Sequence, residues 1–224
     1  MRTVSCPSCG AEVSFRSPAL PSRVCDYCRT ILVRSGGGIE AVGKAAVLPF
    51  DVSPIGIGTR GTFDGRGFDV VGRVRWGWTD GSWNEWLLLF GDGSDAWLGE
   101  AMGQFMLTEE RALGDVQGDD TIRKLILGSR VLIGARAMID GETFIVSDAR
   151  DATCIAAEGE LPFSPKPGWT IHSVDFRSAS GRCASLQREE TLSSFYQGRY
   201  VTLDELAPRG LRPIEGWRAP AYGG

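Results

Sequence analysis

The sequence predicts a mostly β protein with few short helices. Three observations lead to this fold class: short segments in which apolar and polar residues alternate, Asp-Gly and other turn signals between them, and one segment that occurs twice with the same pattern. The 224 residues include 30 glycines, which suit the many turns of such a fold. The length allows one large or two small domains with a real hydrophobic core.

The N-terminal segment carries two Cys-x2-Cys pairs separated by 15 residues. The predicted metal ligands are Cys6, Cys9, Cys25 and Cys28. Each tight turn brings two sulfurs to one point, and two such turns complete the tetrahedral thiolate shell that zinc prefers. Residues 12–16 and 30–33 predict two strands around the pairs, and Gly10 follows the first pair where a positive φ is often needed. Residues 1–34 therefore resemble a zinc ribbon with a structural Zn²⁺; iron in a rubredoxin-like site would use similar spacing.

The chain divides after this ribbon. A flexible joint is predicted at Ser35-Gly36-Gly37-Gly38. The whole of residues 35–54 is expected to be a Gly-rich linker with an apolar lead-in strand. The first β repeat is expected over residues 55–118 and the second over residues 119–207. Residues 208–224 form a Pro/Gly-rich tail that reads as an irregular strap or a docking peptide.

The repeat is clearest where residues 57–70 align without a gap with residues 133–146. Both copies follow the pattern I-G-x-R-x-x-(F/I)-D-G-x-x-F-x-V, and Asp-Gly supplies the two positive-φ positions of a type I′ hairpin turn. Each copy is expected to end in a short helix, one at residues 109–113 and one at residues 202–206, where Thr202 and Glu205 have capping-box spacing. Two architectures remain open: two tandem small β-barrel-like (SH3-like) repeats, or one β-sandwich with pseudo-two-fold symmetry.

Five tryptophans lie close together in the first copy: Trp76, Trp78, Trp83, Trp86 and Trp97. One interpretation is a stacking platform for bases or sugars, which requires basic residues on the same exposed face. Alternation instead places Phe68, Val70, Val74, Trp76 and Trp78 on one strand face and Arg73 and Arg75 on the other. We therefore expect the tryptophans to build the core, with Arg75 stacked over Trp86.

No set of residues predicts catalysis. His172 is the single histidine, and neither a G-x-S-x-G elbow nor a papain-like cysteine accompanies it. Cys154 and Cys183 are expected to be buried, unreactive thiols, and the adjacent pairs 109–110 and 189–190 to suit helix starts better than acid–base catalysis. We therefore expect that the protein is not an enzyme.

Composition limits the function further. The formal net charge of −4 excludes a globally basic nucleic-acid coat but allows a local basic patch. There is no run of about 18 apolar residues and no apolar N-terminal stretch, so neither a transmembrane helix nor a signal peptide is expected. We therefore expect a cytoplasmic location.

The cysteine pairs, the repeated I-G-x-R…D-G-x-x-F-x-V segments and Trp83-Asn84-Glu85-Trp86-Leu87-Leu88-Leu89-Phe90 resemble a bacterial family described as a domain of unknown function, DUF4178, in which a zinc ribbon sometimes comes first. The resemblance covers most of the chain. It implies that the protein is encoded beside proteins related to polyamine synthesis and membrane stress, and it supplies no catalytic residues that could be carried over.

The function expected from these observations is that of a non-enzymatic interaction module, an adaptor in a bacterial multiprotein system related to membrane stress or polyamines. The alternative is nucleic-acid binding through the ribbon and an arginine-bearing β face. The residues expected to contact a partner are Arg66, Arg73, Arg75, Trp217 and Tyr222.

Overall fold

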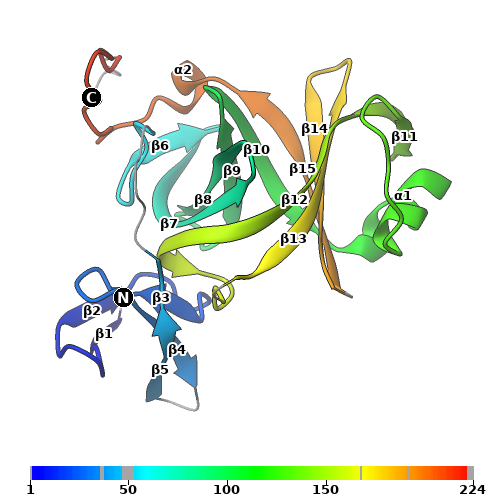
Figure 1. Cartoon of the computed structure of the whole chain (residues 1–224). Helices are drawn as coiled ribbons and strands as arrows, with labels where there is room; N and C mark the ends of the chain where they lie inside the picture. Colours follow the sequence, from blue (N-terminus) through cyan, green and yellow to red (C-terminus); the bar gives the residue numbers. More distant parts are fainter. Residues whose placement is uncertain (1, 36–37, 47–52, 167, 191, 221–224) are drawn as a thin grey trace.

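The fold is described from a computed structural model of the whole chain. Its described residues are 2–35, 38–46, 53–166, 168–190 and 192–220. The chain is mostly β, as the sequence predicts, with a small N-terminal ribbon next to a large ring of antiparallel strands (Figure 1).

The ribbon consists of two small hairpins that hold the cysteine pairs. Its strands are β1 (Arg2–Ser5), β2 (Glu12–Phe15), β3 (Ser22–Val24), β4 (Thr30–Ser35) and β5 (Gly38–Lys44). The first hairpin pairs β1 with β2, and the second sheet has the order β5-β4-β3. Its strand β3 also pairs with β12 of the ring, so the ribbon continues the large sheet.

The segment expected to be a flexible linker is part of this second sheet. Ser35 ends β4, Gly38 begins β5, and the two residues are register partners in an antiparallel hairpin. Residues 36–37 and 47–52 lie outside the described residues. A Gly-rich run serves a tight hairpin as readily as a linker, and the sequence does not distinguish the two uses.

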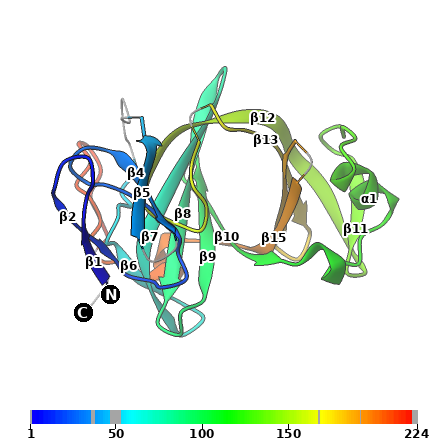
Figure 2. The same cartoon turned by 90° about the horizontal axis from the view of Figure 1, so that it is seen from below.

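Eight strands close the ring. They are β7 (Arg66–Trp78), β8 (Gly81–Phe90), β9 (Asp95–Ala101), β10 (Gln104–Arg111), β12 (Glu142–Leu161), β13 (Thr170–Ser178), β14 (Arg182–Glu189) and β15 (Leu192–Val201). Strands β7 to β10 form one meander and β12 to β15 a second. The β10–β15 and β7–β12 pairs join the two meanders antiparallel, and the view from below looks through the resulting ring (Figure 2).

The internal repeat is visible in the backbone. The short strands β6 (Arg60–Phe63) and β11 (Arg136–Ile139) form hairpins with β7 and β12, and both turns have the expected positive φ, 47° and 76° at Asp64-Gly65 and 51° and 79° at Asp140-Gly141. The amide of Gly58 donates to the carbonyl of Val70, and that of Gly134 to Val146, at 2.8 and 2.9 Å. Each joining pair, β7–β12 and β10–β15, links equivalent strands of the two repeats. The arrangement is one pseudo-two-fold ring.

A β-bulge in each repeat changes which side chains share a face. The register shifts between Val70 and Gly72 in β7 and between Val146 and Asp148 in β12. A bulge inserts one residue into the strand. Two side chains separated by an even number of positions, which would otherwise share a face, therefore point to opposite faces when the bulge lies between them. Phe68 and Val70 therefore belong to a different cluster from Val74 and Trp76, although simple alternation placed them on one face.

The register of the β7–β8 hairpin also differs from the expectation. Trp76 lies opposite Trp83 and Arg73 opposite Trp86. It is consequently Arg73, and not Arg75, that stacks over the Trp86 ring, at 4.4 Å from the ring centroid. Pairing Trp78 with Gly81 places the turn at residues 79–80, and this one-residue difference shifts every pair along the hairpin by two.

Each repeat packs its own apolar cluster on the outer face of the ring. In the first, Trp86 and Leu88 pack with Leu206 of helix α2 (Leu203–Leu206); in the second, Phe176 and Leu186 pack with Ile122 of helix α1 (Asp120–Ile126). A third cluster lies inside the ring and includes Leu20, Val24 and Ile31 of the ribbon together with Trp76, Leu87 and Trp97.

The short helices match the expectation in one repeat. Thr202 and Glu205 form the predicted capping box at the start of α2. Glu109 and Glu110, expected at a helix start, lie in β10 and pair with β15, and only a 3₁₀ turn (Leu113–Asp115) follows. The partner strand decides this segment, since two adjacent glutamates suit an exposed strand edge as well. None of the helices in the described part of the chain is long and apolar enough to cross a membrane.

Candidate functional sites: a cysteine cluster and the cavity of the ring

The four ribbon cysteines converge on one point. Their Sγ atoms lie within 4.8 Å of one another, with 3.7 Å between Cys6 and Cys28 and 3.8 Å between Cys9 and Cys25. A tetrahedral metal site with metal–sulfur bonds of about 2.3 Å has sulfur–sulfur edges of about 3.8 Å. The side chains therefore have the separation that a four-thiolate metal site requires.

Both knuckles use the same backbone geometry. The amide of Gly10 donates to the carbonyl of Cys6 and that of Arg29 to Cys25, at 2.8 and 3.0 Å. Gly10 and Arg29 both have positive φ, 77° and 63°. The expected role of Gly10 is confirmed, while the second knuckle places an arginine at the equivalent position. With four thiolates around one point, an ion bound here has no open coordination position for a reaction.

The ribbon is fastened to the ring through two acidic residues of β12. Glu160 is fully buried and accepts hydrogen bonds from the backbone amides of Arg16 and Ser17, at 2.7 and 3.1 Å. Arg29 donates to the carboxylate of Glu158 at 3.0 Å. These contacts fix the ribbon hairpins against the cluster inside the ring.

The inside of the ring contains a cavity of about 570 Å³. Every one of the eight ring strands contributes to its lining, for example Trp78 from β7, Glu85 from β8, Asp175 from β13 and Tyr196 from β15. The exposed residue Met102 and the β7–β8 turn lie at its rim. Trp97 belongs both to the lining and to the cluster that the ribbon enters, so ribbon and cavity share a wall.

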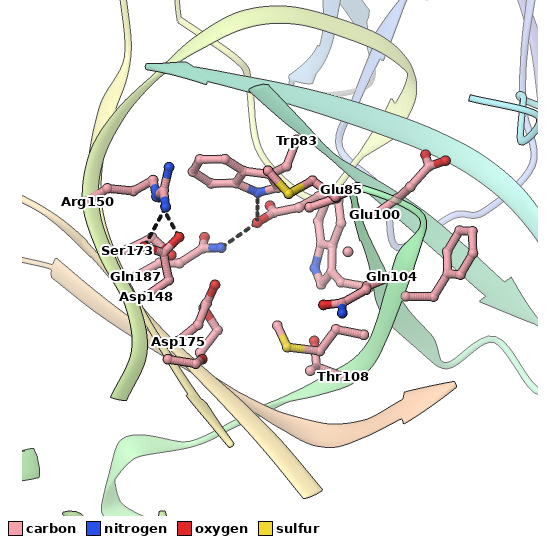
Figure 3. Close-up of a pocket in the computed structure, with 18 of the residues that line it drawn as sticks. Trp83, Glu85, Glu100, Gln104, Thr108, Asp148, Arg150, Ser173, Asp175 and Gln187 are labelled. Atoms are coloured by element: carbon pink, nitrogen blue, oxygen red, sulfur yellow. Dashed lines mark hydrogen bonds and ion pairs between the residues drawn. The ribbon is translucent and has the colours of Figure 1, made fainter. Parts of the chain in front are cut away.

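Glu85 is a cavity carboxylate held by three hydrogen bonds (Figure 3). The indole N–H groups of Trp76 and Trp83 donate to its two oxygens, at 2.9 and 3.1 Å, and the side-chain amide of Gln187 donates at 2.6 Å. All three donors are neutral. Burial raises the pKa of the Glu85 carboxyl, and the three hydrogen bonds act in the opposite direction.

A second acidic group, Asp175, faces the cavity from the other repeat (Figure 3). Burial raises its pKa to about 6, the negative charges of Glu85 and Asp148 add to this rise, and the Ser185 hydroxyl opposes it. The nearest cation, Arg150, is engaged elsewhere. It forms a two-point ion pair with Asp148, at 2.5 and 2.6 Å, and stacks over the ring of Trp78 at 4.2 Å.

The tryptophans divide between two roles. Trp76, Trp86 and Trp97 are buried, in keeping with the expected core role, whereas Trp78 and Trp83 are half-buried. Trp78, Trp83 and Trp97 line the cavity. Of the charged residues in the cavity lining, five are acidic and two are arginines. A basic stacking platform of the kind considered from the sequence is therefore not assembled.

The arginines expected to contact a partner already have partners within the chain. Arg73 is 1% exposed and bonds to Asn84 and Glu158, which makes it a structural residue with no surface for a partner. Arg66 pairs with Glu109 and lies over the Phe90 ring, and Arg75 donates to Ser82.

The two aromatic residues of the tail have different outcomes. Trp217 is 36% exposed, and Tyr222 lies outside the described residues.

His172 and the two remaining cysteines lie away from the cavity lining. His172 is buried on β13, with Nδ1 at 2.9 Å from both Asp151 and Arg130. Burial raises the pKa of Cys154 to about 11 and that of Cys183 to about 12, so both remain protonated thiols.

Sequence reasoning missed Glu85 and Asp175, and a signal for them was present. Counting from the paired Trp83 and Trp169, Glu85 corresponds to Ile171 and Asp175 to Leu89. In each case a carboxylate stands where the other repeat has an aliphatic residue. An acidic side chain on an inward strand position is costly unless the interior contains water or a ligand.

Comparison with known proteins gives one match. No curated protein and no solved structure matches the chain. The model of one family, described as a domain of unknown function (DUF4178), matches residues 56–203. This range contains both hairpin repeats and all eight ring strands, and it excludes the ribbon. The match covers more than half of the length of the chain, and the chain therefore belongs to the DUF4178 family.

Proposed function

We propose that this protein is a non-enzymatic binding module in which the inside of the β ring holds a small ligand. The observation that carries this proposal is the cavity of about 570 Å³, to which all eight strands contribute. Its volume is within the range of ligand sites, about 300–1,000 Å³, and its lining combines aromatic walls with many polar and charged groups. The interaction role expected from the sequence is thus kept, with the ring interior added to the outer surfaces as a working part.

The ribbon is proposed to act as a structural support that holds zinc. Four thiolates at tetrahedral separations favour zinc, and a closed shell of this kind stabilises a segment too small to fold on a core of its own. Its residues Leu20, Val24 and Ile31 belong to the same apolar cluster as Trp97, which also lines the cavity, so its folding supports the cavity wall.

A substitution that fills the cavity tests the ligand-binding proposal. Gly99 lines the cavity opposite Glu85, and a Cβ there would meet its nearest neighbour, the carbonyl of Met106, at an ordinary 3.6 Å. Gly99→Leu therefore places a side chain into the cavity without backbone strain. Gly67→Leu is the matched control, because Gly67 is exposed on β7 and nothing lies within 4 Å of its Cβ position.

The measurement is ligand-observed NMR with water-soluble amines, alcohols and carboxylates of about ten heavy atoms. At least one compound should bind to the wild type and to Gly67→Leu and be lost with Gly99→Leu. If every bound compound binds equally to all three proteins, the cavity is not a ligand site.

A second candidate, the protein adaptor, is favoured by one surface feature. Leu127, Leu132 and Ile133 are 85%, 82% and 64% exposed on the connection between α1 and β11. Exposed apolar groups of this kind mark interaction surfaces. Crosslinking in cells should capture a partner that Leu127→Asp/Leu132→Asp loses and an Arg136→Asp control keeps; equal capture by both variants would count against the adaptor role.

The nucleic-acid alternative is less well supported. Arg66, Arg73 and Arg75 bond within the chain and do not form one exposed basic face. Binding that depends steeply on salt would still favour it, since phosphate contacts release counterions.

A further inference from the structure

We propose that the ring cavity selects a small organic cation: a protonated amine on an aliphatic or aryl stem, with its charge at Glu85 and its stem against the tryptophans. This inference rests on the proposed ligand-binding function and names the class of ligand. Three properties of the cavity support it: the negative charge of its lining, the lack of a cationic partner for Glu85 among the described residues, and the aromatic walls.

The lining is acidic overall. It contains five carboxylate residues and two arginines. The carboxylates are Asp80, Glu85, Glu100, Asp148 and Asp175. Arg150 and Asp148 neutralise each other in a two-point ion pair, which leaves four carboxylates and one arginine, the exposed Arg177. The potential inside the cavity therefore favours a positively charged ligand over a neutral or negative one.

Glu85 has hydrogen bonds but no counter-ion among the contacts of the described residues. Its partners are two indoles and an amide, which orient the carboxylate without supplying positive charge. A carboxylate has about four lone-pair sites, so these three donors leave room for one further donor. An ammonium group entering the cavity would provide both the missing hydrogen bond and the missing charge.

The aromatic walls fit a cation as well as an apolar stem. Trp78, Trp83, Trp97 and Tyr196 all line the cavity. The chain itself already places a cation on one of these rings, because the Arg150 guanidinium lies 4.2 Å from the centroid of Trp78. Aromatic faces attract organic cations most strongly when both are removed from water, which the enclosed ring provides.

Protonation gives the proposed site a pH signature. Burial raises the pKa values of Glu85 and Asp175, so both carboxyls hold their protons to a higher pH than usual when the cavity contains no ligand. An ammonium ion binds the ionised form. Since the pKa of Asp175 is about 6, affinity for an amine should rise between about pH 5 and pH 7.5, with release of protons from the protein, until the amine itself loses its charge near pH 10.

The test compares three probes of one shape on the full-length protein: 2-phenylethylamine, 2-phenylethanol and 3-phenylpropanoate. Calorimetry at pH 7.5 should give at least about tenfold tighter binding for the amine than for either analogue, as expected for a charge-assisted hydrogen bond. In Glu85→Gln, which removes the charge and keeps one of the two acceptor oxygens, amine affinity should fall about tenfold or more. Glu215→Gln, which changes an exposed carboxylate outside the cavity lining, should leave it unchanged.

The outcomes separate the two proposals. If all three probes bind equally and Gly99→Leu abolishes their binding, the cavity binds ligands but does not select cations, and this inference fails alone. If Gly99→Leu leaves every probe bound, the cavity site itself fails. Should Glu85→Gln not fold, wild-type amine affinity that is flat between pH 5 and pH 7.5 overturns the inference.

Discussion

Glu160 of the ring and Arg23 of the ribbon form an ion pair across the strands that join the two parts of the molecule. Arg23 Nη1 lies 3.1 Å from Glu160 Oε1, and the two residues are also register partners of the β12–β3 pair. Glu160 is fully buried, and the Arg23 side chain is 11% exposed. The pair fixes the ribbon in register with the ring at the level of the interior cluster.

Replacing Glu160 should therefore destabilise the whole protein. Glu160→Ala leaves Arg23 Nη1 and the amides of Arg16 and Ser17 without their acceptor, while Asp26 still binds Arg23 Nη2. Breaking one side of a buried pair costs about 3–5 kcal/mol. Denaturant unfolding measures this loss. The exposed Glu12→Ala is the control and should stay within about 0.5 kcal/mol of the wild type; a similar small change in Glu160→Ala would show that the ribbon does not contribute to ring stability.

Metal removal should change the environment of the interior tryptophans. The purified protein is expected to hold one zinc ion per chain, and Cys25→Ser should lose it, whereas Cys154→Ser should retain it because Cys154 lies outside the cluster. Since Leu20, Val24 and Ile31 belong to one apolar cluster with Trp76 and Trp97, loss of the metal should also shift tryptophan fluorescence. Elemental analysis and emission spectra check both points. Finding iron in place of zinc would show that the predicted metal is wrong. Unchanged fluorescence would show that the ribbon does not support the cavity wall.

Ring closure should depend on glycines at both seams. At the β10–β15 seam, a Cβ on Gly198 would lie 1.9 Å from the carbonyl oxygen of Leu107; at the β7–β12 seam, a Cβ on Gly72 would lie 1.9 Å from that of Glu160. Backbone oxygens cannot move aside as a flexible side chain can. Gly198→Ala and Gly72→Ala should each destabilise the protein by at least about 1–3 kcal/mol.

Gly67→Ala is the control for both seams, since its Cβ position is open. Thermal and denaturant unfolding compare the three variants. Equal stability of Gly198→Ala and Gly67→Ala would contradict the close approach of β10 and β15.

The stability difference between the wild type and Asp175→Asn should depend on pH in a defined direction. Because burial raises the pKa of Asp175 from 3.8 to about 6, the folded state binds the proton more tightly than the unfolded state. Ionisation of Asp175 therefore lowers the free energy of unfolding of the wild type as the pH rises from about 4 to about 6, by roughly 3 kcal/mol in total. Above this range the group causes no further loss. Asparagine removes this loss.

Denaturant unfolding of both proteins between pH 4 and pH 8 gives the test. Asp175→Asn should gain stability relative to the wild type as the pH rises, and the difference should level off above about pH 7. Comparing the two proteins cancels the opposite trend of carboxylates whose pKa is lowered, such as Asp140 and Glu142. A difference that is constant with pH would mean that Asp175 is not buried in its charged form.

The amino-acid sequence alone determined the local features. The spacing of Cys6, Cys9, Cys25 and Cys28 identified the cluster, Asp-Gly at 64–65 and 140–141 identified two equivalent hairpins, and Thr202 with Glu205 identified a helix start. Each of these depends on contacts within a few residues or on a repeated pattern. Such information is contained in a short stretch of chain and needs no knowledge of distant partners.

Only the tertiary structure decided how the two repeats join and what they enclose. The bulges after Val70 and Val146 exchange the faces of their strands, and the β7–β12 and β10–β15 pairs close the ring. Glu85 and Asp175 come from different repeats, 90 positions apart, so no local pattern places them in one cavity. Strand pairing across such distances is set by the packing of whole sheets, because a single extra residue in one strand reverses which side chains face inward.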